Sequence, residues 1–310
     1  MSATFSEDSW RSYYKLIVKP RIAITVGDPA GIGPEIAHKA ACDARVRAAC
    51  DPVLYGPSPG ATFPAGVLSA ATGRAAYEAI CAAVRDARAQ LVHGIATAPI
   101  SKLAFAHAGL PWKGHTDLLA HLTNSRRVAM MFWSEPLKVI LATVHVSLAE
   151  VPRLLTPELL HDIIDLTTGE LPRFGLAAPR LALCGLNPHA GEHGLLGDED
   201  ERVLRPAVSA ARQRGIAIDG PFPADTIFVR ASRGEFDAVI ACYHDQGLIP
   251  VKLLAFGRAV NVTLGLPIVR TSVDHGTAFD IAGKGVADPS SMIEAVLLAA
   301  RLAKAGPGRR

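Results

Sequence analysis

Short runs of Val, Ile and Leu alternate along this chain with longer Ala-, Leu- and Arg-rich segments of helical period. This alternation is typical of a parallel or mixed sheet covered by helices, so it predicts an α/β fold. Strands are predicted at residues 21–26, 53–55, 94–98, 128–133, 137–144, 180–184 and 238–242. Helices are predicted at residues 34–41, 73–89, 157–170, 199–214 and 291–304, with Asp198 capping the fourth and residues 288–290 the last. Residues 56–64, which hold three prolines and two glycines, are predicted to be a loop.

Composition excludes several classes of protein. The 310 residues are 49% hydrophobic, enough to bury a large core, and the formal charge of +3 comes from scattered Lys and Arg with no basic stripe for nucleic acid. Charges and prolines interrupt every apolar run, so no membrane span is expected. The five cysteines lack a Cys-x-x-Cys pair, and residues 1–18 do not resemble a secretory signal. We therefore expect reduced thiols and a cytoplasmic protein.

Three apolar runs each end in a polar turn that carries a histidine. These runs are VILATVHVS with His145, LALCGLNPHAGE with His189 and AVIACYHDQG with His244. In an open α/β sheet ligands gather at the carboxyl ends of strands, so the three imidazoles are predicted to converge on a divalent metal. Zn²⁺ suits such a set best, and Mn²⁺, Co²⁺ or Mg²⁺ could serve with substrate oxygens. A single histidine of this kind would be interpreted as a hydrogen-bonded turn residue, but three at equivalent positions favour the metal.

Other polar groups lie on turns bounded by Gly and Pro. The segment ITVGDPAGIGPEIAHKA reads as strand, Gly-rich turn and helix, and its amides could hold an anion or simply form a tight turn. Lys252, Asn261 and Arg270 follow the third histidine and could clamp a phosphate or carboxylate. His115 and Thr116 in KGHTD, and Asp225 in GPFPADT, are further candidates.

Eight motifs in order resemble the signature series of the 4-hydroxythreonine-4-phosphate dehydrogenase family. They are GDPAGIGPE, TAPISK, GHTD, NPHAGE, GPFPADT, YHDQGLIPVK, VNVTLGLP and RTSVDHGTAFDIAGKG, and together they run from about residue 21 to 303. This resemblance implies a two-lobed α/β/α fold like that of isocitrate and isopropylmalate dehydrogenases, with the active site in the interlobe cleft. It implies an N-terminal extension at 1–18, a first lobe at 19–110 completed by 260–304, a second lobe at 111–259 with metal and dimer-interface elements, and a tail at 305–310.

The activity that the resemblance implies is oxidation of a secondary alcohol by NAD, or alternatively NADP, followed by loss of CO₂. The substrate would be 4-phosphohydroxy-L-threonine and the product 3-amino-2-oxopropyl phosphate, a step toward pyridoxal phosphate. The enzyme would be a homodimer with a shared active site and one divalent metal per subunit.

Residue roles are likewise implied by position in the matching motifs. The metal would be held by His145, His189 and His244, and the substrate by His115, Thr116, Lys252, Asn261 and Arg270. The adenosine half of the cofactor would lie on the DHGTAFDIAGKGVADP loop, at His275, Gly276, Ala278, Asp280 and Asp288. Candidates for the group that takes the hydroxyl proton are Asp225, Lys252 and Asp245, with Asp225 ranked first because a carboxylate near a metal-bound alcohol can accept a proton directly.

The chain also departs from the family pattern. The region 56–68 is shorter than usual, and Asp117 stands where Glu is usual after Gly-His-Thr. Paralogues of the family oxidise phosphothreonate or phosphoerythronate, and a distant branch oxidises aromatic cis-dihydrodiols. Retention of Asn261 and Arg270 favours a phosphorylated substrate, with the related four-carbon acids as the alternative. A metal- and phosphate-binding protein without turnover is disfavoured because the full set of site residues is present.

Overall fold

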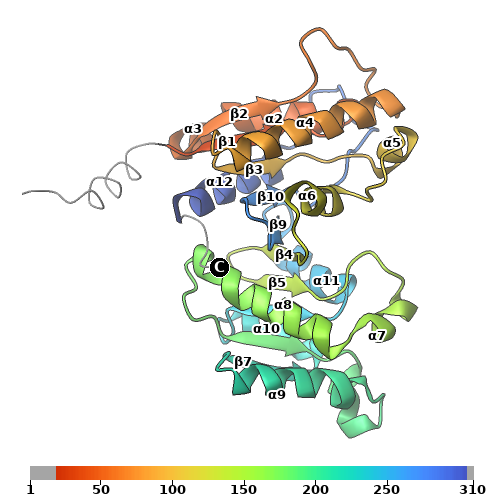
Figure 1. Ribbon diagram of the computed structural model, residues 1–310, viewed down its shortest axis with the longest axis vertical. Coiled ribbons are helices and arrows are strands. Elements are labelled where there is room, and N and C mark those ends of the chain that lie inside the picture. The colour runs from red at the N-terminus through yellow and green to blue at the C-terminus, as the bar shows by residue number, and fades with distance from the viewer. Residues whose placement is uncertain (1–18, 306–310) are drawn as a thin grey trace, which may run out of the picture. The chain divides into compact units, whose positions relative to one another are not determined.

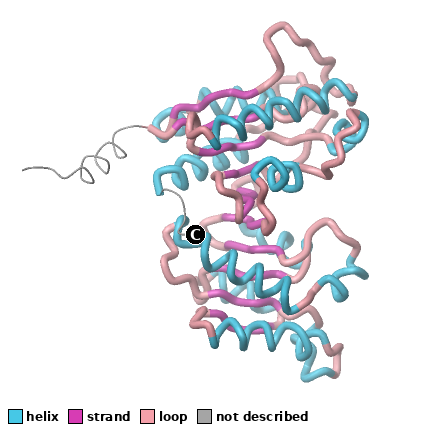
Figure 2. The backbone as a smooth tube through the Cα atoms, in the orientation of Figure 1, coloured by secondary structure: helices cyan, strands magenta, loops and turns pink. Residues whose placement is uncertain are grey.

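The computed structural model describes residues 19–305 and divides into two compact units. The first unit comprises residues 19–123 and 267–305, and the second comprises residues 124–266. In each unit strands lie between helices, as Figure 2 shows in magenta and cyan. The predicted α/β fold is confirmed.

The first unit has a parallel four-stranded arrangement in the order β2-β1-β3-β10. Its strands are β1 (Arg21–Thr25), β2 (Asp51–Tyr55), β3 (Gly94–Thr97) and β10 (Arg270–Ser272), and its helices are α2 (Gly33–Cys42), α3 (Ala44–Ala49), α4 (Ala70–Arg88), α5 (Lys102–His107), α6 (His115–Thr123) and α12 (Ser290–Ala305). Helices α2, α3 and α12 pack against the sheet, and so does α4, which is itself covered by α5 and α6 (Figure 1). Every residue of β3 is buried, as expected for a parallel strand covered on both faces.

The second unit has the strand order β9-β4-β5-β8-β6-β7. Its strands are β4 (Ala129–Trp133), β5 (Lys138–Leu141), β6 (Leu181–Cys184), β7 (Ile218–Phe222), β8 (Ala238–Ala241) and β9 (Val260–Leu264), and its α-helices are α7 (Val151–Leu154), α8 (Pro157–Glu170), α9 (Arg205–Gln213), α10 (Ala224–Ser232) and α11 (His244–Ala255). Strand β4 runs antiparallel to β5 and β9, whereas β5, β8, β6 and β7 are mutually parallel. The core under α10 and α11 is built from residues such as Val139, Phe228 and Val251.

The four parallel strands of the second unit point their carboxyl ends toward one edge of the sheet. Strand β5 leads toward His145, β6 toward His189, β7 toward Asp225 and β8 directly into His244 at the start of α11. This edge is where open α/β sheets place their ligands. The backbone therefore supplies four loops from which polar side chains can project.

Several predicted elements differ in their bounds. The strand predicted at 137–144 ends at Leu141, because residues from 142 on form a turn in which His145 adopts a left-handed conformation. The strand predicted at 53–55 begins at Asp51 and includes Pro52, which an edge strand tolerates. The loop predicted at 56–64 is confirmed.

The fourth predicted helix, at 199–214, is broken into a π-helical turn, η4 (Asp200–Leu204), and α9. Asp198 does not cap it and instead forms an ion pair with Arg202. The cause lies in Asp200, which is fully buried and accepts hydrogen bonds from the amides of Leu186 and Asn187. This side chain ties the first turn to the loop after β6, so the helix cannot begin regularly.

The unit boundaries lie after Thr123 and after Leu266, whereas boundaries after residues 110 and 259 were expected. The first boundary is later because α5 and α6 both pack on α4 of the first unit. The second is later because β9 pairs with β4 inside the second unit along its whole length. Residues 1–18 and 306–310, which include the predicted extension and most of the predicted tail, lie outside the described residues.

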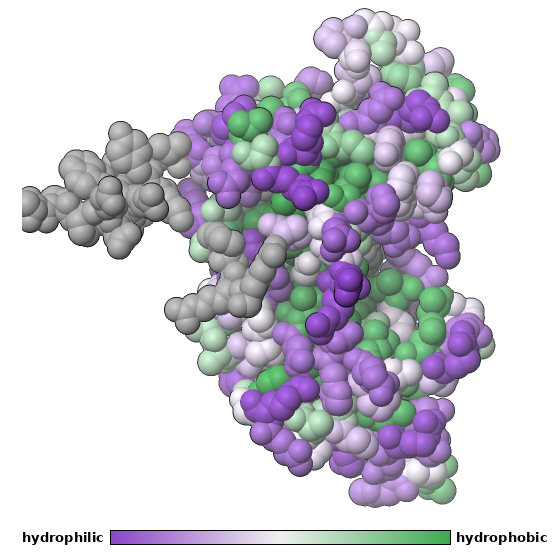
Figure 3. All heavy atoms as spheres, viewed as in Figure 1, coloured by the Kyte–Doolittle hydropathy of each residue, from purple (hydrophilic) through white to green (hydrophobic). Residues whose placement is uncertain are grey.

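No helix within residues 19–305 is long and apolar enough to span a membrane. All five cysteines fall in this range and carry free thiols. On the face drawn in Figure 3, hydrophilic residues cover much of the surface, with apolar residues between them.

Candidate active site

Two of the three predicted metal ligands lie side by side at the carboxyl edge of the second unit. The rings of His145 and His244 are tilted against each other with their centroids 5.6 Å apart. The Nδ1 atom of His244 lies 2.7 Å from a carboxylate oxygen of Asp245. A carboxylate on Nδ1 fixes the tautomer and leaves Nε2 as the metal-binding nitrogen, which is the usual arrangement of a ligating histidine.

The backbone at His145 and His189 is in a conformation that side chains other than Gly rarely adopt. Their φ angles are 50° and 53°, and the left-handed conformation continues after His189 as far as His193. Strained residues of this kind persist where the surrounding structure enforces them, and they cluster at functional sites. The strain is a second observation, independent of the motif, that marks these two turns.

The loop that carries His189 is held by two buried polar residues. Asp200 accepts the amides of Leu186 and Asn187, and Gln246 of α11 donates to the carbonyl of Gly185 across 2.8 Å. The same Gln246 side chain accepts the amide of Cys242 across 2.7 Å. These contacts join the loop after β6 to the first turn of α11. Neither Asp200 nor Gln246 stood out in the sequence, because their partners are remote.

The expected convergence of three histidines is not found within one copy of the chain. Among residues 19–305 no group of three His, Cys, Asp or Glu side chains is arranged to hold a metal ion. His189 is 68% exposed in its side chain and contacts Glu192 through Nδ1 at 3.1 Å. The adjacent pair His145 and His244 fits part of a metal site, and the ligand set needs at least one more donor.

The other candidates of the second unit occupy separate elements. Asp225 is exposed in the first turn of α10, and Lys252 is exposed in the last turns of α11. Asn261 lies in β9, and its Oδ1 is buried without a hydrogen-bond partner among the described residues. A buried acceptor left open in this way is costly unless a ligand or water completes it.

In the first unit the structure brings Arg270 and His115 together. Arg270, the first residue of β10, is 3% exposed, and its Nη2 donates to the hydroxyl of Thr97 across 2.9 Å. His115 begins α6 beside Thr116, and its Nε2 is buried with no hydrogen-bond partner in the described part of the chain. Thr97 was not singled out by the sequence, although it opens the TAPISK motif.

Burial perturbs both of these ionisable groups. It lowers the pKa of Arg270 to about 9. The pKa of His115 is held well below its usual value, first by burial and then by the positive charge of Arg270. At neutral pH the pair therefore consists of a buried cation beside a neutral imidazole. An anion placed here would be stabilised by the cation and by hydrogen bonds.

The Gly-rich turn after β1 is filled by the protein's own backbone. A Cβ added to Gly31 would lie 2.8 Å from the carbonyl oxygen of Thr277, and one added to Gly33 would lie 2.0 Å from that of Val26. The amide of Ile32 already donates to Thr277 across 2.9 Å. Of the two interpretations left open by the sequence, these contacts favour a structural turn over an anion cradle.

The predicted cofactor residues lie on the long loop between β10 and α12. His275, Gly276 and Asp280 are exposed there, and Ala278 has a φ of 42°. Asp288 accepts both the amide and the hydroxyl of Ser290, which lowers the pKa of its carboxyl. Asp288 therefore shapes the start of α12, whereas the exposed residues of the loop leave room for a ligand.

Helix α2 anchors the far end of this loop. The ammonium of Lys39 donates to the carbonyls of Gly285 and Ala287 across 3.0 and 2.8 Å. Glu35 accepts from the same ammonium at 2.7 Å and from the amide of Ala287 at 2.8 Å. A backbone segment held at both carbonyl and amide groups is suited to present a fixed surface to a cofactor.

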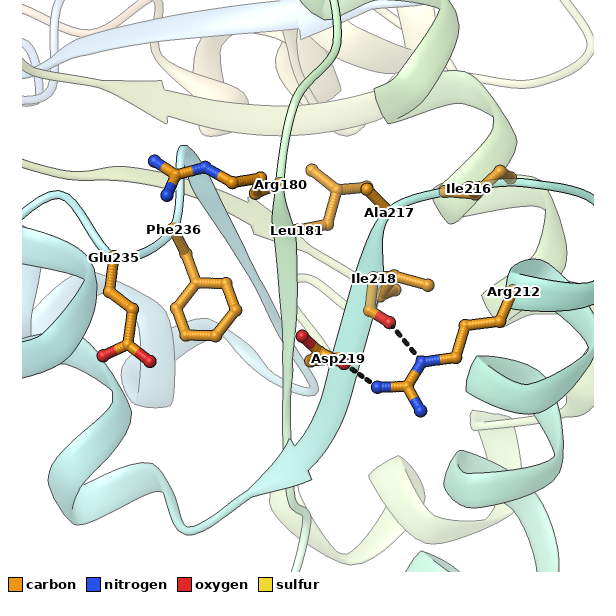
Figure 4. A pocket seen from close by; sticks show the side chains of 9 residues that line it. All are labelled: Arg180, Leu181, Arg212, Ile216, Ala217, Ile218, Asp219, Glu235 and Phe236. Atoms are coloured by element: carbon orange, nitrogen blue, oxygen red, sulfur yellow. Dashed lines mark hydrogen bonds and ion pairs between the residues drawn. The ribbon is translucent and has the colours of Figure 1, made fainter.

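A cavity of about 360 Å³ in the second unit lies at the opposite end of the strands (Figure 4). The cavity lies where β6 and β7 begin, and its lining includes Arg180, Leu181, Ile218 and Phe236. Its charged groups are occupied by the protein, since Arg212 contacts both Asp219 and the Ile218 carbonyl. This cavity is separate from the carboxyl edge and has no free charge set toward a ligand.

Comparison with known proteins identifies what the chain resembles. A family model described as pyridoxal phosphate biosynthetic protein PdxA matches residues 34–299. The chain is 44% identical to 4-hydroxythreonine-4-phosphate dehydrogenase of Geobacter metallireducens, covering 92% of this chain and 96% of that relative. It is also 44% identical to D-threonate 4-phosphate dehydrogenase of Cupriavidus necator, covering 92% and 97%. A crystal structure of 4-hydroxythreonine-4-phosphate dehydrogenase from Klebsiella pneumoniae superposes with a TM-score of 0.83 at 40% identity, covering 92% and 98%.

Proposed function

Because the chain belongs to the pyridoxal phosphate biosynthetic protein PdxA family, whose curated relatives are dehydrogenases, we propose that it oxidises and decarboxylates 4-phosphohydroxy-L-threonine. Its product would be 3-amino-2-oxopropyl phosphate, and its oxidant NAD. The observation that carries the proposal is the buried guanidinium of Arg270 with the buried Nε2 of His115 near it, which we interpret as an anion site.

The buried cation favours a phosphorylated substrate. A guanidinium is planar and can donate two hydrogen bonds to one phosphate, and in a buried site these bonds are stronger than in water. The hydroxyl of Thr116 and the imidazole of His115 supply further hydrogen-bonding groups at the start of α6. Lys252 and Asn261 are proposed as substrate-binding residues as well, and the open Oδ1 of Asn261 supports a ligand there.

The proposed reaction has two steps. The hydride leaves the carbinol carbon for the nicotinamide ring, and the hydroxyl proton passes to a base. The resulting β-keto acid then loses CO₂, the electrons of the broken C–C bond form an enolate with the ketone, and a proton returned to the α-carbon gives the product. A phosphate gripped away from the reacting carbon supplies binding energy that orients it.

We propose Asp225 as the group that takes the hydroxyl proton. It is exposed at the start of α10, on the same sheet edge as His145 and His244. Asp245 also lies at this edge, but its carboxylate contacts His244 and is placed to orient that ring. Lys252 remains the second candidate for proton transfer.

We further propose that His145 and His244 hold a divalent metal, Zn²⁺ in the first instance and Mg²⁺, Mn²⁺ or Co²⁺ otherwise. Such an ion lowers the pKa of a bound alcohol and stabilises negative charge on the neighbouring oxygen. His189 would complete the ligand set from a second copy of the chain, since it does not join the other two within one copy. This arrangement requires a homodimer with a shared site.

Exposed apolar residues support the proposed dimer. On α11 the side chains of Ile249 and Leu253 are 59% and 81% exposed, and Phe256 directly after the helix is 79% exposed. Their spacing of four and three residues places them on one helical face. This face belongs to the same helix that begins at His244, so a partner seated there would lie on an element of the metal site.

We propose that the loop between β10 and α12 holds NAD, with His275, Gly276, Ala278 and Asp280 as contacts. Apart from the two adjoining residues, no heavy atom of the described chain lies within 4 Å of a Cβ placed on Gly276, so the backbone is open to a ligand at that point. NADP is the alternative cofactor. We also propose a cytoplasmic location, which the five free thiols support.

A second candidate substrate is D-threonate 4-phosphate, because the Cupriavidus necator relative bearing that name is as similar as the Geobacter metallireducens relative. On the α-carbon, 4-phosphohydroxy-L-threonine carries an amino group, whereas D-threonate 4-phosphate carries a hydroxyl group. The exposed carboxylate of Asp117 lies in the first turn of α6, two residues after His115, and accepts the amide of Lys113 at 3.3 Å. Asp117 stands where the family usually has Glu, and we propose it as a residue that distinguishes the two substrates.

One assay separates these candidates. Purified protein with NAD and Zn²⁺ is offered 4-phosphohydroxy-L-threonine and D-threonate 4-phosphate in turn, and NADH and CO₂ are both measured. The proposal expects a higher kcat/KM for the amino acid, with NADH and CO₂ in equal amounts. A higher value for the threonate would reassign the substrate, and no NADH from either would refute the proposed activity.

A further inference from the structure

A chain of hydroxyl groups joins β3 to β10 behind the guanidinium of Arg270. The hydroxyl of Ser272 donates to the carbonyl of Thr97 across 3.1 Å, and the hydroxyl of Thr97 donates to Ser272 Oγ across 2.9 Å. Arg270 Nη2 donates to Thr97 Oγ1 across 2.9 Å. All three residues are buried.

The directions of these hydrogen bonds follow from the donors available. A carbonyl can only accept, so the single hydrogen of Ser272 points to the Thr97 carbonyl. Ser272 Oγ is then left as an acceptor, and the single hydrogen of Thr97 is directed to it across 2.9 Å, with the carbonyl of Thr271 as a longer second acceptor at 3.4 Å. Thr97 Oγ1 consequently presents a lone pair to Arg270.

Strand register keeps these groups in place. Strands β3 and β10 are parallel neighbours, with Ser272 opposite Thr97 and Arg270 opposite Ile95. Rotation of the Thr97 hydroxyl away from Arg270 would break the bond to Ser272 within the buried sheet. The acceptor offered to Arg270 is therefore fixed by the sheet and not by a mobile loop.

We propose that Thr97 is a positioning residue for substrate phosphate, which it orients through Arg270. Thr97 itself does not touch the phosphate. The Thr97 hydroxyl is an uncharged acceptor for one guanidinium nitrogen of Arg270. This contact therefore fixes the plane of the guanidinium without neutralising its positive charge. A carboxylate at the same place would fix the fork but oppose an incoming anion. This inference rests on the proposed function in taking Arg270 as the phosphate ligand.

The matched control is Thr25 on the neighbouring strand β1. Thr25 pairs with Thr97 in the β1–β3 register and is likewise fully buried. Its hydroxyl has no hydrogen-bond partner within residues 19–305. Thr97→Val and Thr25→Val therefore remove the same atom from adjacent strands, and only one of them removes the contact to Arg270.

Binding of inorganic phosphate to the full-length protein, measured by calorimetry, tests the proposal. We expect Thr97→Val to weaken phosphate binding about tenfold, Thr25→Val to leave it unchanged, and Thr97→Ser to restore it. In steady-state kinetics Thr97→Val should lower kcat/KM for the phosphorylated substrate and leave that for 4-hydroxy-L-threonine unchanged. A purely structural role would lower both.

Ser272→Ala serves if Thr97→Val does not fold. It removes the nearer acceptor of the Thr97 hydroxyl and leaves the carbonyl of Thr271 at 3.4 Å, so we expect about threefold weaker phosphate binding. Phosphate affinity equal to wild type in both Thr97→Val and Ser272→Ala, with Arg270→Ala impaired, would overturn the inference and leave the proposed function standing. If wild type and Arg270→Ala bind inorganic phosphate with equal affinity, Arg270 is not a phosphate ligand. The role proposed for Thr97 would then be refuted as well.

Discussion

Two aspartates at the carboxyl edge of the second unit differ in what they contact. Asp245 lies 2.7 Å from His244 Nδ1, whereas Asp225 is exposed on the neighbouring α10. A carboxylate that orients a ligating imidazole acts on metal affinity, and a carboxylate that accepts the substrate proton acts on turnover. The two roles can be separated by experiment.

Asp225→Asn is expected to lower kcat by about 100-fold or more and to leave metal content unchanged, because it removes the proton acceptor. Asp245→Asn is expected to weaken Zn²⁺ binding by about 10- to 100-fold, with kcat recovered at high Zn²⁺. Elemental analysis together with metal-titrated kinetics measures both effects. If Asp225→Asn instead weakened Zn²⁺ binding and Asp245→Asn lowered kcat at saturating Zn²⁺, Asp245 would be the proton acceptor and Asp225 the residue that supports the metal site.

The buried imidazole of His115 predicts a pH dependence of stability. Its pKa in the folded protein lies well below that of the unfolded chain, so at low pH the unfolded chain binds a proton that the folded protein does not. The stabilisation is complete above the unfolded pKa of about 6.5 and is lost as pH falls below it. The free energy of unfolding should therefore fall between pH 7.5 and 5.5 by an amount attributable to His115.

Urea unfolding of wild type and His115→Gln at these two pH values measures that loss. The free energy of unfolding of the variant should fall less steeply between them. Equal falls in the two proteins would show that His115 is protonated in the folded state.

At the scale of elements, the sequence predicts the strands whose buried residues are apolar and contiguous, such as β1, β3 and β8. It does not predict β7, whose sequence IDGPF contains Gly and Pro, or β10, which has only three residues. Helix α11 was also missed, because it begins at a histidine and contains Pro250. These elements form through tertiary pairing, which overrides local propensity.

The candidate site was predictable only where it is local in sequence. The histidines were found from the strand ends that precede them. The contact between Thr97 and Arg270 joins residues 173 positions apart, and nothing in a single sequence marks such a pair. The same holds for the contacts of Lys39 with the carbonyls of residues 285 and 287.

The anchoring of the proposed cofactor loop by α2 gives a prediction at this scale. Lys39→Met removes the ammonium that holds two carbonyls of the loop. The loop of the variant is then less ordered before binding, and ordering it costs free energy when the cofactor binds. We expect NAD to bind about fivefold more weakly and inorganic phosphate to bind as in wild type. Calorimetry with each ligand measures this, with the exposed Lys304→Met on α12 as control. Unchanged NAD affinity in Lys39→Met would show that the anchoring of this loop does not contribute to NAD binding.

For the whole molecule, the proposed dimer makes metal binding depend on association. Leu253→Glu places a charge on the exposed apolar face of α11. We expect a monomer in sedimentation, with native circular dichroism, reduced Zn²⁺ content and little activity, because His189 of a partner would no longer complete the site. Leu103→Glu, at a 56% exposed position on α5, is the control and should leave all four properties unchanged. A Leu253→Glu dimer, or a monomer with full metal content, would contradict the shared site.

We propose that Arg270 makes this dehydrogenase specific for a phosphorylated hydroxy acid. The most direct measurement compares kcat/KM for 4-phosphohydroxy-L-threonine with that for 4-hydroxy-L-threonine, in wild type and in Arg270→Ala. We predict a preference of about 100-fold or more for the phosphorylated acid in wild type, and loss of most of it in the variant. Equal kcat/KM for the two acids in wild type, or a preference that survives Arg270→Ala, would contradict this role of Arg270.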